Sequence, residues 1–269
     1  MRAARAHAKI NLALVVGAVR PDGKHDVMTV IERVALHDDV ALEPAAETTV
    51  EGYPDDTLVR AALGALATSA RMQRGWSVRL DKRIPVAAGL GGGSSDAAAA
   101  LELANATFEQ PLPDAELHSL AAELGADVPF FLRRGAQLAT ADGTELAPLA
   151  LPKDYVVLLL VPHGVSKEST ASVYAAFDRR DGARGFTERG ARLQEVVDAI
   201  SGLDDLAALP PNDLASSPLA DELLELGAFR ADVSGAGPTV YGLFREREHA
   251  LRAEEAVRDR GRTIVTEPA

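Results

Sequence analysis

Residues 85–96 read Pro-Val-Ala-Ala-Gly-Leu-Gly-Gly-Gly-Ser-Ser-Asp, and an alanine-rich run follows directly over 97–105. Glycines in such a loop allow positive φ angles and a close approach of the backbone to a ligand. Ser94 and Ser95 are candidate N-caps for a helix, and the alanines behind them are strong helix formers. A glycine-rich loop that leads into a helix binds anions, because free N–H groups converge there and the helix dipole favours negative charge. The segment therefore predicts a site for a nucleotide phosphate.

This loop differs from two other phosphate-binding motifs. It lacks the Gly-Lys-Ser/Thr of a Walker A loop, and Ser94 stands where a dinucleotide fingerprint needs its third glycine. The alternative interpretation is a flexible connector before a packed helix. The join of glycines, two serines and an alanine helix favours phosphate binding over that alternative.

The composition is that of an ordinary globular protein. The 269 residues suffice for one large domain or two smaller lobes, and 47% of them are apolar. The formal net charge of −12 argues against DNA or RNA as a main partner, because proteins that bind nucleic acid usually carry a basic face. Without cysteine, the chain has no disulfides, thiolate metal sites or cysteine nucleophile. Its six histidines are dispersed, and no metal ligand is assigned.

The apolar stretch at 10–16 is short and contains Asn11, and no small-residue cleavage site follows it. It is therefore interpreted as a strand rather than as a signal peptide. No run approaches the ~18 apolar residues of a membrane span. We expect a cytoplasmic chain without a membrane partner, and its acidic surface suits a monomer or a homodimer.

Strand patterns and helix patterns come in separate runs rather than in strict alternation, which favours an α+β fold. We expect two lobes, residues 1–150 and 151–269, with the functional site in the cleft between them. The expected strands are 6–19, 27–43, 76–80, 135–141, 154–161, 230–235, 239–244 and 262–266. The expected helices are 55–72, 97–105, 114–124, 167–178, 187–201, 212–226 and 246–260.

Two charged residues outside the loop are candidates for catalysis. Lys9, in Ala-Lys-Ile-Asn, projects from the strand face opposite its apolar neighbours, either into solvent or toward a phosphoryl group or a carboxylate. Asp127, in Gly-Ala-Asp-Val-Pro, is either a cap or turn residue or a carboxylate that accepts a hydroxyl proton. A lysine within ~4–6 Å would keep that carboxylate ionised, which would pair Lys9 with Asp127.

A second glycine loop, Ser-Gly-Ala-Gly-Pro-Thr, lies at 234–239. It is either a plain hairpin turn or a wall of the nucleotide or substrate site, where small residues permit close approach. Phosphoryl transfer needs a cradle of N–H donors, a positive charge and an oriented nucleophile. The two loops with Lys9 and Asp127 contain these parts, so the sequence predicts a phosphotransferase.

These segments resemble the three motifs of the GHMP small-molecule kinases. The similar stretches are Ala-Lys-Ile-Asn at 8–11, the glycine loop at 85–95 and the second loop at 234–239, in the same order as in that family. The resemblance covers nearly the whole chain. It implies the two-lobed GHMP kinase fold, with ATP and Mg²⁺ as cofactors.

Further stretches are similar to one branch of that superfamily, whose substrate is a cytidine diphosphate alcohol. They are Asp-Gly-Lys-His-Asp at 22–26, Gly-Ala-Asp-Val-Pro at 125–129, Asn-Asp-Leu at 212–214 and the stretch 165–174. The resemblance therefore implies ATP and a cytidine diphosphate alcohol as small-molecule partners, in isoprenoid precursor biosynthesis by the non-mevalonate route.

The resemblance also implies a role for each matching residue. Asp127 would be the general base, and Lys9 would hold Asp127 ionised and steady the developing charge. Asn11 would contact the hydroxyl region of the substrate, and His25 would recognise the edge of the cytosine. ATP-binding residues would be Pro85, Gly89, Leu90, Gly91, Gly92, Gly93, Ser94 and Ser95, with a serine hydroxyl near Mg²⁺. The third-motif residues are Ser234, Gly235, Gly237 and Thr239.

One substrate-binding position departs from the family, which commonly has a tyrosine stacked on cytosine where this chain has Lys24. A lysine stem covers a ring face but does not stack as an aromatic ring does. Two alternatives therefore stay open. The first is a GHMP kinase for another alcohol, such as homoserine, mevalonate or a sugar. The second is a nucleotide-binding protein without catalysis, although a mere binder would need neither Lys9 nor Asp127.

Overall fold

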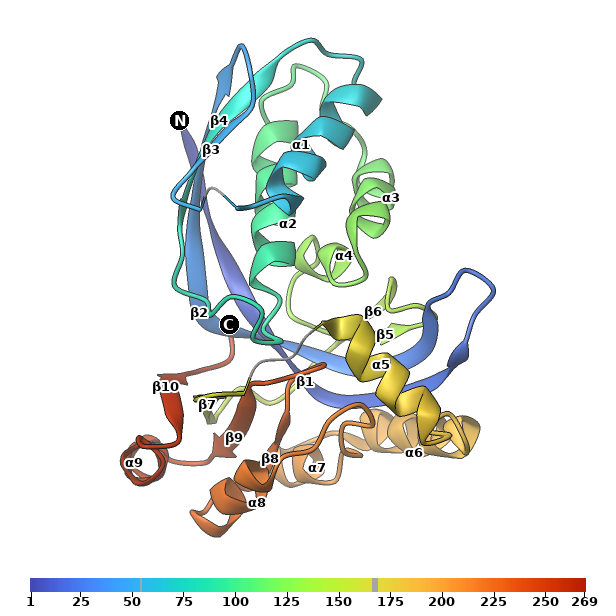
Figure 1. The fold of residues 1–269 in the computed structure, drawn as a ribbon, viewed down its shortest axis with the longest axis vertical. Helices are drawn as coiled ribbons and strands as arrows, with labels where there is room; N and C mark the ends of the chain where they lie inside the picture. The colour runs from blue at the N-terminus through green and yellow to red at the C-terminus, as the bar shows by residue number, and fades with distance from the viewer. Residues whose placement is uncertain (54, 166–168) are drawn as a thin grey trace. The chain divides into compact units, whose positions relative to one another are not determined.

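The computed structural model describes residues 1–53, 55–165 and 169–269, which Figure 1 shows as a ribbon. These residues pack into two compact units. The first unit contains 1–8, 36–86 and 91–134, and the second contains 9–35, 87–90 and 135–269. The boundary expected at residue 150 divides the sequence once, whereas the two units are interleaved along the chain. The long strands β1 (Arg2–Val19) and β2 (His25–Ala45) each contribute residues to both units.

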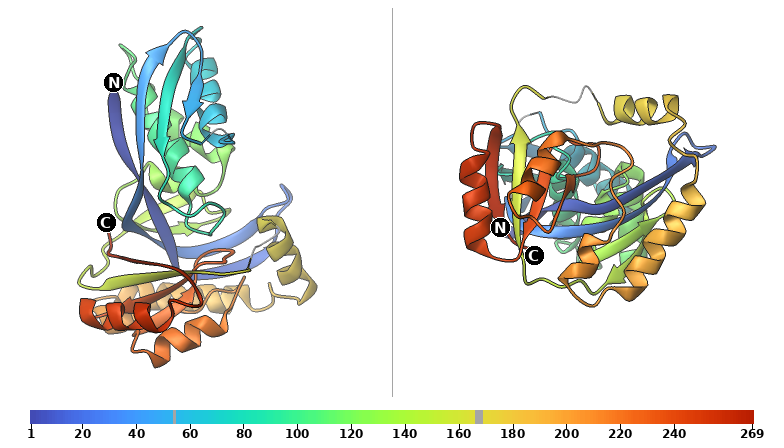
Figure 2. Two further views of the ribbon diagram at one scale, coloured as in Figure 1. Left: turned by 60° about the vertical axis from the view of Figure 1, so that its left-hand side comes forward. Right: turned by 90° about the horizontal axis from the view of Figure 1, so that it is seen from below.

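The first unit is a sheet with helices on one face (Figures 1 and 2). β2 pairs antiparallel with β4 over residues 39–45, and β3 pairs parallel with β4. Trp76, Val78 and Leu80 of β4 are buried while the residues between them are more exposed, as the alternating pattern predicts. The bounds are β3 (Thr49–Glu51), β4 (Gly75–Asp81), α1 (Leu58–Ser69), α2 (Gly92–Asn105), α3 (Asp114–Leu124) and α4 (Val128–Phe131).

The second unit contains the antiparallel sheet β10-β7-β9-β8, and β2 pairs there with β5, which pairs with β6. α8 and α9 pack against the four-stranded sheet around Leu158, Leu223 and Phe244. The strands are β5 (Ala136–Thr140), β6 (Glu145–Leu149), β7 (Val156–Pro162), β8 (Arg230–Val233), β9 (Val240–Phe244) and β10 (Gly261–Thr266). The helices are α5 (Thr170–Arg179), α6 (Phe186–Ala199), α7 (Leu203–Ala207), α8 (Pro218–Glu225) and α9 (Arg247–Ala256).

The α+β class is confirmed, but the start of α2 was predicted wrongly. The N-cap is Gly91, with φ 71°, and no side chain caps the helix. Ser94 and Ser95 therefore lie inside the first turn rather than at the cap. The left-handed conformation that ends the loop favours glycine at position 91, and Gly92 and Gly93 then enter the helix.

The helix expected over 212–226 is also too long, because α8 begins only at Pro218. Ser217 caps it by accepting a hydrogen bond from the Leu219 N–H, and Pro218 occupies the first turn, where its missing N–H costs nothing. The expected helix over 167–178 and the similar stretch 165–174 fall in part on residues 166–168, which lie outside the described residues. Within the described ranges, no helix has the length and apolar character needed to cross a bilayer.

Candidate active site

In the second unit, the glycine loop contacts the third-motif loop. The Ser234 hydroxyl donates a hydrogen bond to the Gly89 carbonyl oxygen at 2.9 Å, and the Thr239 N–H donates to that of Ala88 at 3.2 Å. Gly89 has φ 82°, and a Cβ atom there would lie 2.5 Å from the Ser234 carbonyl oxygen. Only glycine fits this approach. The two loops, which are 145 residues apart along the chain, therefore form one surface.

Lys9 and Asn11 lie beside these loops on β1, and each is only 4% exposed. The Lys9 Nζ donates to Asn11 Oδ1 at 2.6 Å, and the Lys9 N–H donates to the Leu90 carbonyl oxygen at 2.9 Å. A Cβ atom at Gly235 would lie 3.2 Å from Asn11 Oδ1 and 3.3 Å from Lys9 Nζ. The second unit thus brings together the Lys9 strand, residues 87–90 of the glycine loop and the third-motif loop.

The third-motif loop has two glycines with positive φ, Gly235 at 57° and Gly237 at 74°. The Gly237 N–H donates to the Ser234 carbonyl oxygen at 2.9 Å, which closes a tight turn. Ser234 and Thr239 are both buried, and the Thr239 hydroxyl has no hydrogen-bond partner among the described residues. This buried polar lining suits a ligand-contacting loop better than a plain hairpin turn.

Asn212 and Asp213 hold the third-motif loop and β1 at the same time. The Asn212 Nδ2 donates to the carbonyl oxygens of Val233 and Gly235 at 2.9 and 2.6 Å. The Asp213 N–H donates to the Leu14 carbonyl oxygen at 2.8 Å, and its carboxylate accepts from the Val16 N–H at 2.8 Å. The sequence placed this dipeptide inside a helix, so its contacts were missed.

The rest of the glycine loop belongs to the first unit. The N–H groups of the first turn of α2, from Gly92 to Ser94, precede the first intrahelical bond, which the Ser95 N–H donates to the Gly91 carbonyl oxygen at 2.9 Å. Because no side chain caps this helix, its N-terminal N–H groups and its dipole offer a site for a phosphate group. Pro85, half-buried, stands at the start of the loop.

Asp127 also belongs to the first unit and precedes the short helix α4. It occupies the N-cap position, yet its side chain makes no capping hydrogen bond. The interpretation as a helix cap therefore lacks the hydrogen bond that would explain an aspartate there. The pairing of Asp127 with Lys9 stays a prediction.

His25 lies at the start of β2, buried against residues of α5. Its Nε2 is 2.9 Å from an Asp178 carboxylate oxygen, and its ring centroid is 4.6 Å from that of Tyr174. Lys24 forms an ion pair with Asp142 at 2.6 Å. Burial alone would raise the pKa of Asp142, but hydrogen bonds from Lys24 and Thr144 outweigh it and lower that pKa to about 2. The ammonium of Lys24 is thus engaged, and the aromatic neighbours of His25 are Tyr174 and, at 6.2 Å between ring centroids, Phe177.

The first unit also contains a buried charged cluster that the sequence analysis missed. The Lys82 Nζ donates to Asp38 and Asp96, each at 2.5 Å, and Asp38 also accepts from the Ile84 N–H at the start of the loop. Burial raises the pKa of Asp96 to about 7, and the charges of Asp38 and Asp56 act in the same direction while Lys82 opposes them. Asp38 is 44 residues away from Lys82 in the sequence, so no local pattern indicates their contact. Lys82 and Asp96 are only 14 residues apart and stand on either side of the glycine loop, which is the one sequence signal for the cluster.

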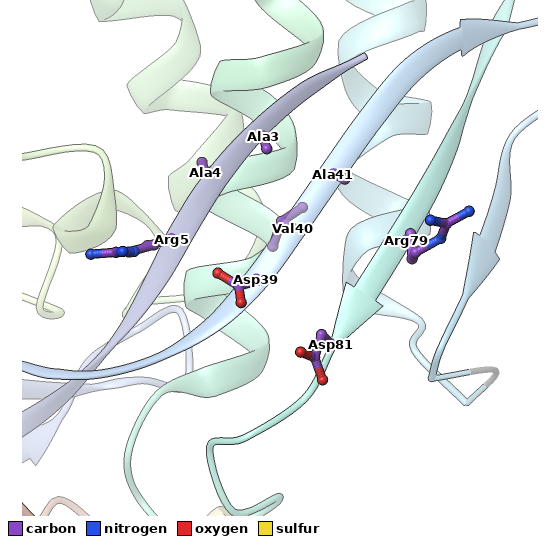
Figure 3. Close-up of a pocket in the computed structure, with 8 residues that line it drawn as sticks. All are labelled: Ala3, Ala4, Arg5, Asp39, Val40, Ala41, Arg79 and Asp81. Atoms are coloured by element: carbon purple, nitrogen blue, oxygen red, sulfur yellow. The ribbon is translucent and has the colours of Figure 1, made fainter.

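A cavity of the first unit, of about 430 Å³, contains none of the predicted site residues (Figure 3). Arg83 forms ion pairs with two of its acidic side chains, Asp39 at 2.6 Å and Asp81 at 3.0 Å. The cavity is lined by Ala3, Ala4, Arg5, Asp39, Val40, Ala41, Arg79 and Asp81. Its mixed charges and small apolar floor do not indicate a phosphate site.

Comparison with known proteins identifies two matching domain families. Residues 57–135 match the GHMP kinases N terminal domain, and residues 192–263 match the GHMP kinases C terminal domain. A 4-diphosphocytidyl-2-C-methyl-D-erythritol kinase from Pelotomaculum thermopropionicum is 40% identical, over 92% of this chain and 90% of the relative. One from Synechococcus sp. is 37% identical, over 94% of this chain and 88% of the relative.

Comparison with solved structures also identifies kinases. A crystal structure of 4-(cytidine 5'-diphospho)-2C-methyl-D-erythritol kinase aligns with a TM-score of 0.78 and 30% identity, over 100% of this chain and 99% of that chain. A mevalonate kinase aligns with a TM-score of 0.72, but its 13% identity indicates a shared fold alone.

Proposed function

The chain belongs to the 4-diphosphocytidyl-2-C-methyl-D-erythritol kinase family of GHMP kinases, and from this premise we propose how its residues transfer a phosphoryl group. Its reaction is the ATP-dependent phosphorylation of the 2-hydroxyl of 4-diphosphocytidyl-2-C-methyl-D-erythritol, in the non-mevalonate route to isoprenoid precursors. The observation that carries the residue assignment is the meeting of Lys9, Asn11 and the third-motif loop, because it places a buried cation beside two glycine-rich backbones.

In the proposed mechanism, Asp127 accepts the proton of the substrate hydroxyl as its oxygen attacks the terminal phosphoryl group. Lys9 keeps Asp127 ionised and stabilises the charge that develops on the transferred group. The phosphates of ATP are held by the first-turn N–H groups of α2, whose dipole favours negative charge. Asn11 orients Lys9 and contacts the hydroxyl region of the substrate.

Mg²⁺ is part of this proposal, since oxygen donors of the kind it prefers are present in the first unit. Ser94 and Ser95 offer two hydroxyls. The serine hydroxyls of the first turn of α2 would hold the ion together with phosphate oxygens, and no acidic ligand is assigned. When bound, Mg²⁺ neutralises charge on the phosphate oxygens.

The cytosine is proposed to bind at His25. The Asp178 carboxylate only accepts hydrogen bonds, so the neutral His25 ring carries its proton on Nε2 and leaves Nδ1 as an acceptor. An acceptor matches the exocyclic amino group of cytosine. Lys24 contributes its aliphatic stem beside the base while its ammonium remains with Asp142. The cytoplasmic location and the monomeric or dimeric state stay predictions.

The experiment that tests the mechanism compares wild-type enzyme with Asp127→Asn in a coupled ADP-release assay. The substrates are ATP with Mg²⁺ and a panel of the cytidine compound, mevalonate and homoserine. We expect selective turnover of the cytidine compound, and a kcat at least about 100-fold lower for Asp127→Asn because the base is lost. ATP binding, measured by titration calorimetry, should survive in the variant.

Asp114→Asn is the matched control, because Asp114 is an exposed carboxylate of the same unit. It should keep wild-type kcat. Wild-type turnover by Asp127→Asn would contradict the base assignment. Turnover of mevalonate or homoserine instead of the cytidine compound would favour the alternative of a GHMP kinase for another alcohol, and would remove His25 from base recognition.

A further inference from the structure

We propose that Thr29, on β2, is a positioning residue for phosphoryl transfer, because its hydroxyl fixes the orientation of the Asn11 amide and, through it, of the Lys9 ammonium. The inference rests on the role proposed for Lys9. It concerns a residue that does not itself touch the reacting atoms.

The hydrogen bonds of Thr29 have only one consistent direction. Its Oγ1 lies 2.6 Å from the Ala13 carbonyl oxygen, which only accepts, so the single hydroxyl proton is donated there. The same Oγ1 lies 2.9 Å from Asn11 Nδ2 and must therefore accept from the amide. Thr29 thus binds the NH₂ group of Asn11, so the amide oxygen of Asn11 points away from Thr29.

That carbonyl oxygen, Asn11 Oδ1, is the acceptor that faces Lys9 Nζ at 2.6 Å. With the amide turned over, an NH₂ group would face the ammonium at this distance, and two donors would repel each other. Thr29 would then have no proton left for the amide oxygen. The Ala13–Thr29–Asn11–Lys9 chain therefore sets where the ammonium of Lys9 is held.

Burial leaves these three side chains few other hydrogen-bond partners. Thr29 is 3% exposed, and Asn11 and Lys9 are each 4% exposed, so water is largely excluded as a substitute partner. Gly235 closes over the other side, since a Cβ atom there would lie within 3.3 Å of both Asn11 Oδ1 and Lys9 Nζ. With partners on both sides, the amide and the ammonium have little room for a second arrangement.

Thr29→Val tests the proposal, because valine keeps the shape of threonine and removes the hydroxyl. We expect kcat with ATP and 4-diphosphocytidyl-2-C-methyl-D-erythritol to fall roughly 10- to 100-fold, since the Lys9 ammonium is no longer held in one position. The KM for ATP should stay within about twofold, because that binding surface is intact. Thr29→Ser keeps the hydroxyl and should restore kcat to within about threefold of wild type.

Thr266→Val is the matched control, a buried strand threonine of the second unit that lies outside this chain of bonds. It should lose stability without losing kcat. If Thr29→Val does not fold, Thr29→Ala removes the same hydroxyl without an added methyl group. Circular dichroism and the thermal midpoint report folding for every variant.

A double-mutant cycle separates positioning from a general loss of packing. If Thr29 acts through Asn11, Thr29→Val should change kcat less than about threefold in an Asn11→Leu background. Wild-type kcat in Thr29→Val, no rescue by Thr29→Ser, or additive losses in the cycle would each overturn the proposal. Wild-type kcat in both Lys9→Ala and Asp127→Asn would instead overturn the roles proposed for Lys9 and Asp127 in phosphoryl transfer.

Discussion

At the scale of single residues, the contact between His25 and Asp178 predicts how the enzyme selects its base. Asp178→Asn replaces an acceptor with an amide that also donates, so the His25 proton is no longer fixed on Nε2. We expect the KM for the cytidine substrate to rise roughly tenfold, with the KM for ATP unchanged. Discrimination against the uridine analogue should weaken, because Nδ1 can then donate to the uracil oxygen.

Steady-state kinetics with both nucleotide analogues measure this effect. Asp181→Asn is the control, since Asp181 is exposed and asparagine tolerates its positive φ of 54°. Unchanged cytidine-to-uridine selectivity in Asp178→Asn would show that the tautomer of His25 does not select the base.

The residue scale also shows where sequence reasoning ends. Lys9, Asn11 and the glycines were predictable, because short motifs carry their residue types at fixed spacing. Thr29 and Asp178 were not, since the contacts from which we propose their roles join them to residues distant in sequence. The signal for Thr29 was faint: a threonine two residues from Val27 and Ile31, on the buried face of a strand.

At the scale of elements, the segment before α8 predicts how the third-motif loop is held. Asn212→Ala removes two hydrogen bonds to the carbonyl oxygens of Val233 and Gly235, and a third that the Leu214 N–H donates to the Asn212 side chain. We expect a loss of about 2–3 kcal/mol in the free energy of unfolding, because buried carbonyls lose their donor. Amide hydrogen exchange over 234–239 should also speed up relative to wild type.

Asn105→Ala provides a matched comparison in the first unit, because Asn105 makes two similar hydrogen bonds with Leu112. It should cost similar stability in urea denaturation while exchange over 234–239 stays as in wild type. Equal exchange of that loop in the two variants would contradict a local role for Asn212.

Elements with strong patterns were predicted well, and their ends less well. The hairpin of β8 and β9 and the alternation of β4 follow from residue types that repeat at a fixed period. The start of α2 does not, because positive φ at Gly91, rather than a serine side chain, begins the helix. β3 was missed, since three residues are too few for a pattern.

At the scale of the whole molecule, motif order predicted the family but not how the chain divides. Residues 87–90 of the glycine loop belong to the second unit and the rest of that loop to the first, and β1 and β2 contribute residues to both. The sequence analysis expects one boundary between two consecutive lobes, 1–150 and 151–269. In the structure, residues 9–35 of the long paired strands belong to the same unit as residues 135–269. Such pairing depends on contacts distant in sequence, which local periodicity does not report.

Buried carboxylates predict how the stability of the molecule depends on pH. Glu32, on β2, is 0% exposed, and no side chain among the described residues forms a hydrogen bond with its carboxylate. Burial raises its pKa to about 7, although the charge of Lys153 and the backbone N–H and charge of Arg33 oppose this. The phenol of Tyr155, also buried, adds no hydrogen bond. Native protein therefore holds this proton more tightly than unfolded protein does.

Between the unfolded pKa of 4.5 and the native pKa of about 7, the native state binds more protons, so the free energy of unfolding falls as pH rises. Glu32→Gln removes this penalty, and we expect it to exceed wild-type stability at pH 8 by on the order of 1–3 kcal/mol. At pH 4 the difference should nearly vanish. Urea denaturation of both proteins from pH 4 to 8 measures it, with exposed Glu195→Gln as the control. A wild-type-to-variant difference that is constant over this range would mean that Glu32 does not titrate with folding, and that its charge is compensated in the native state.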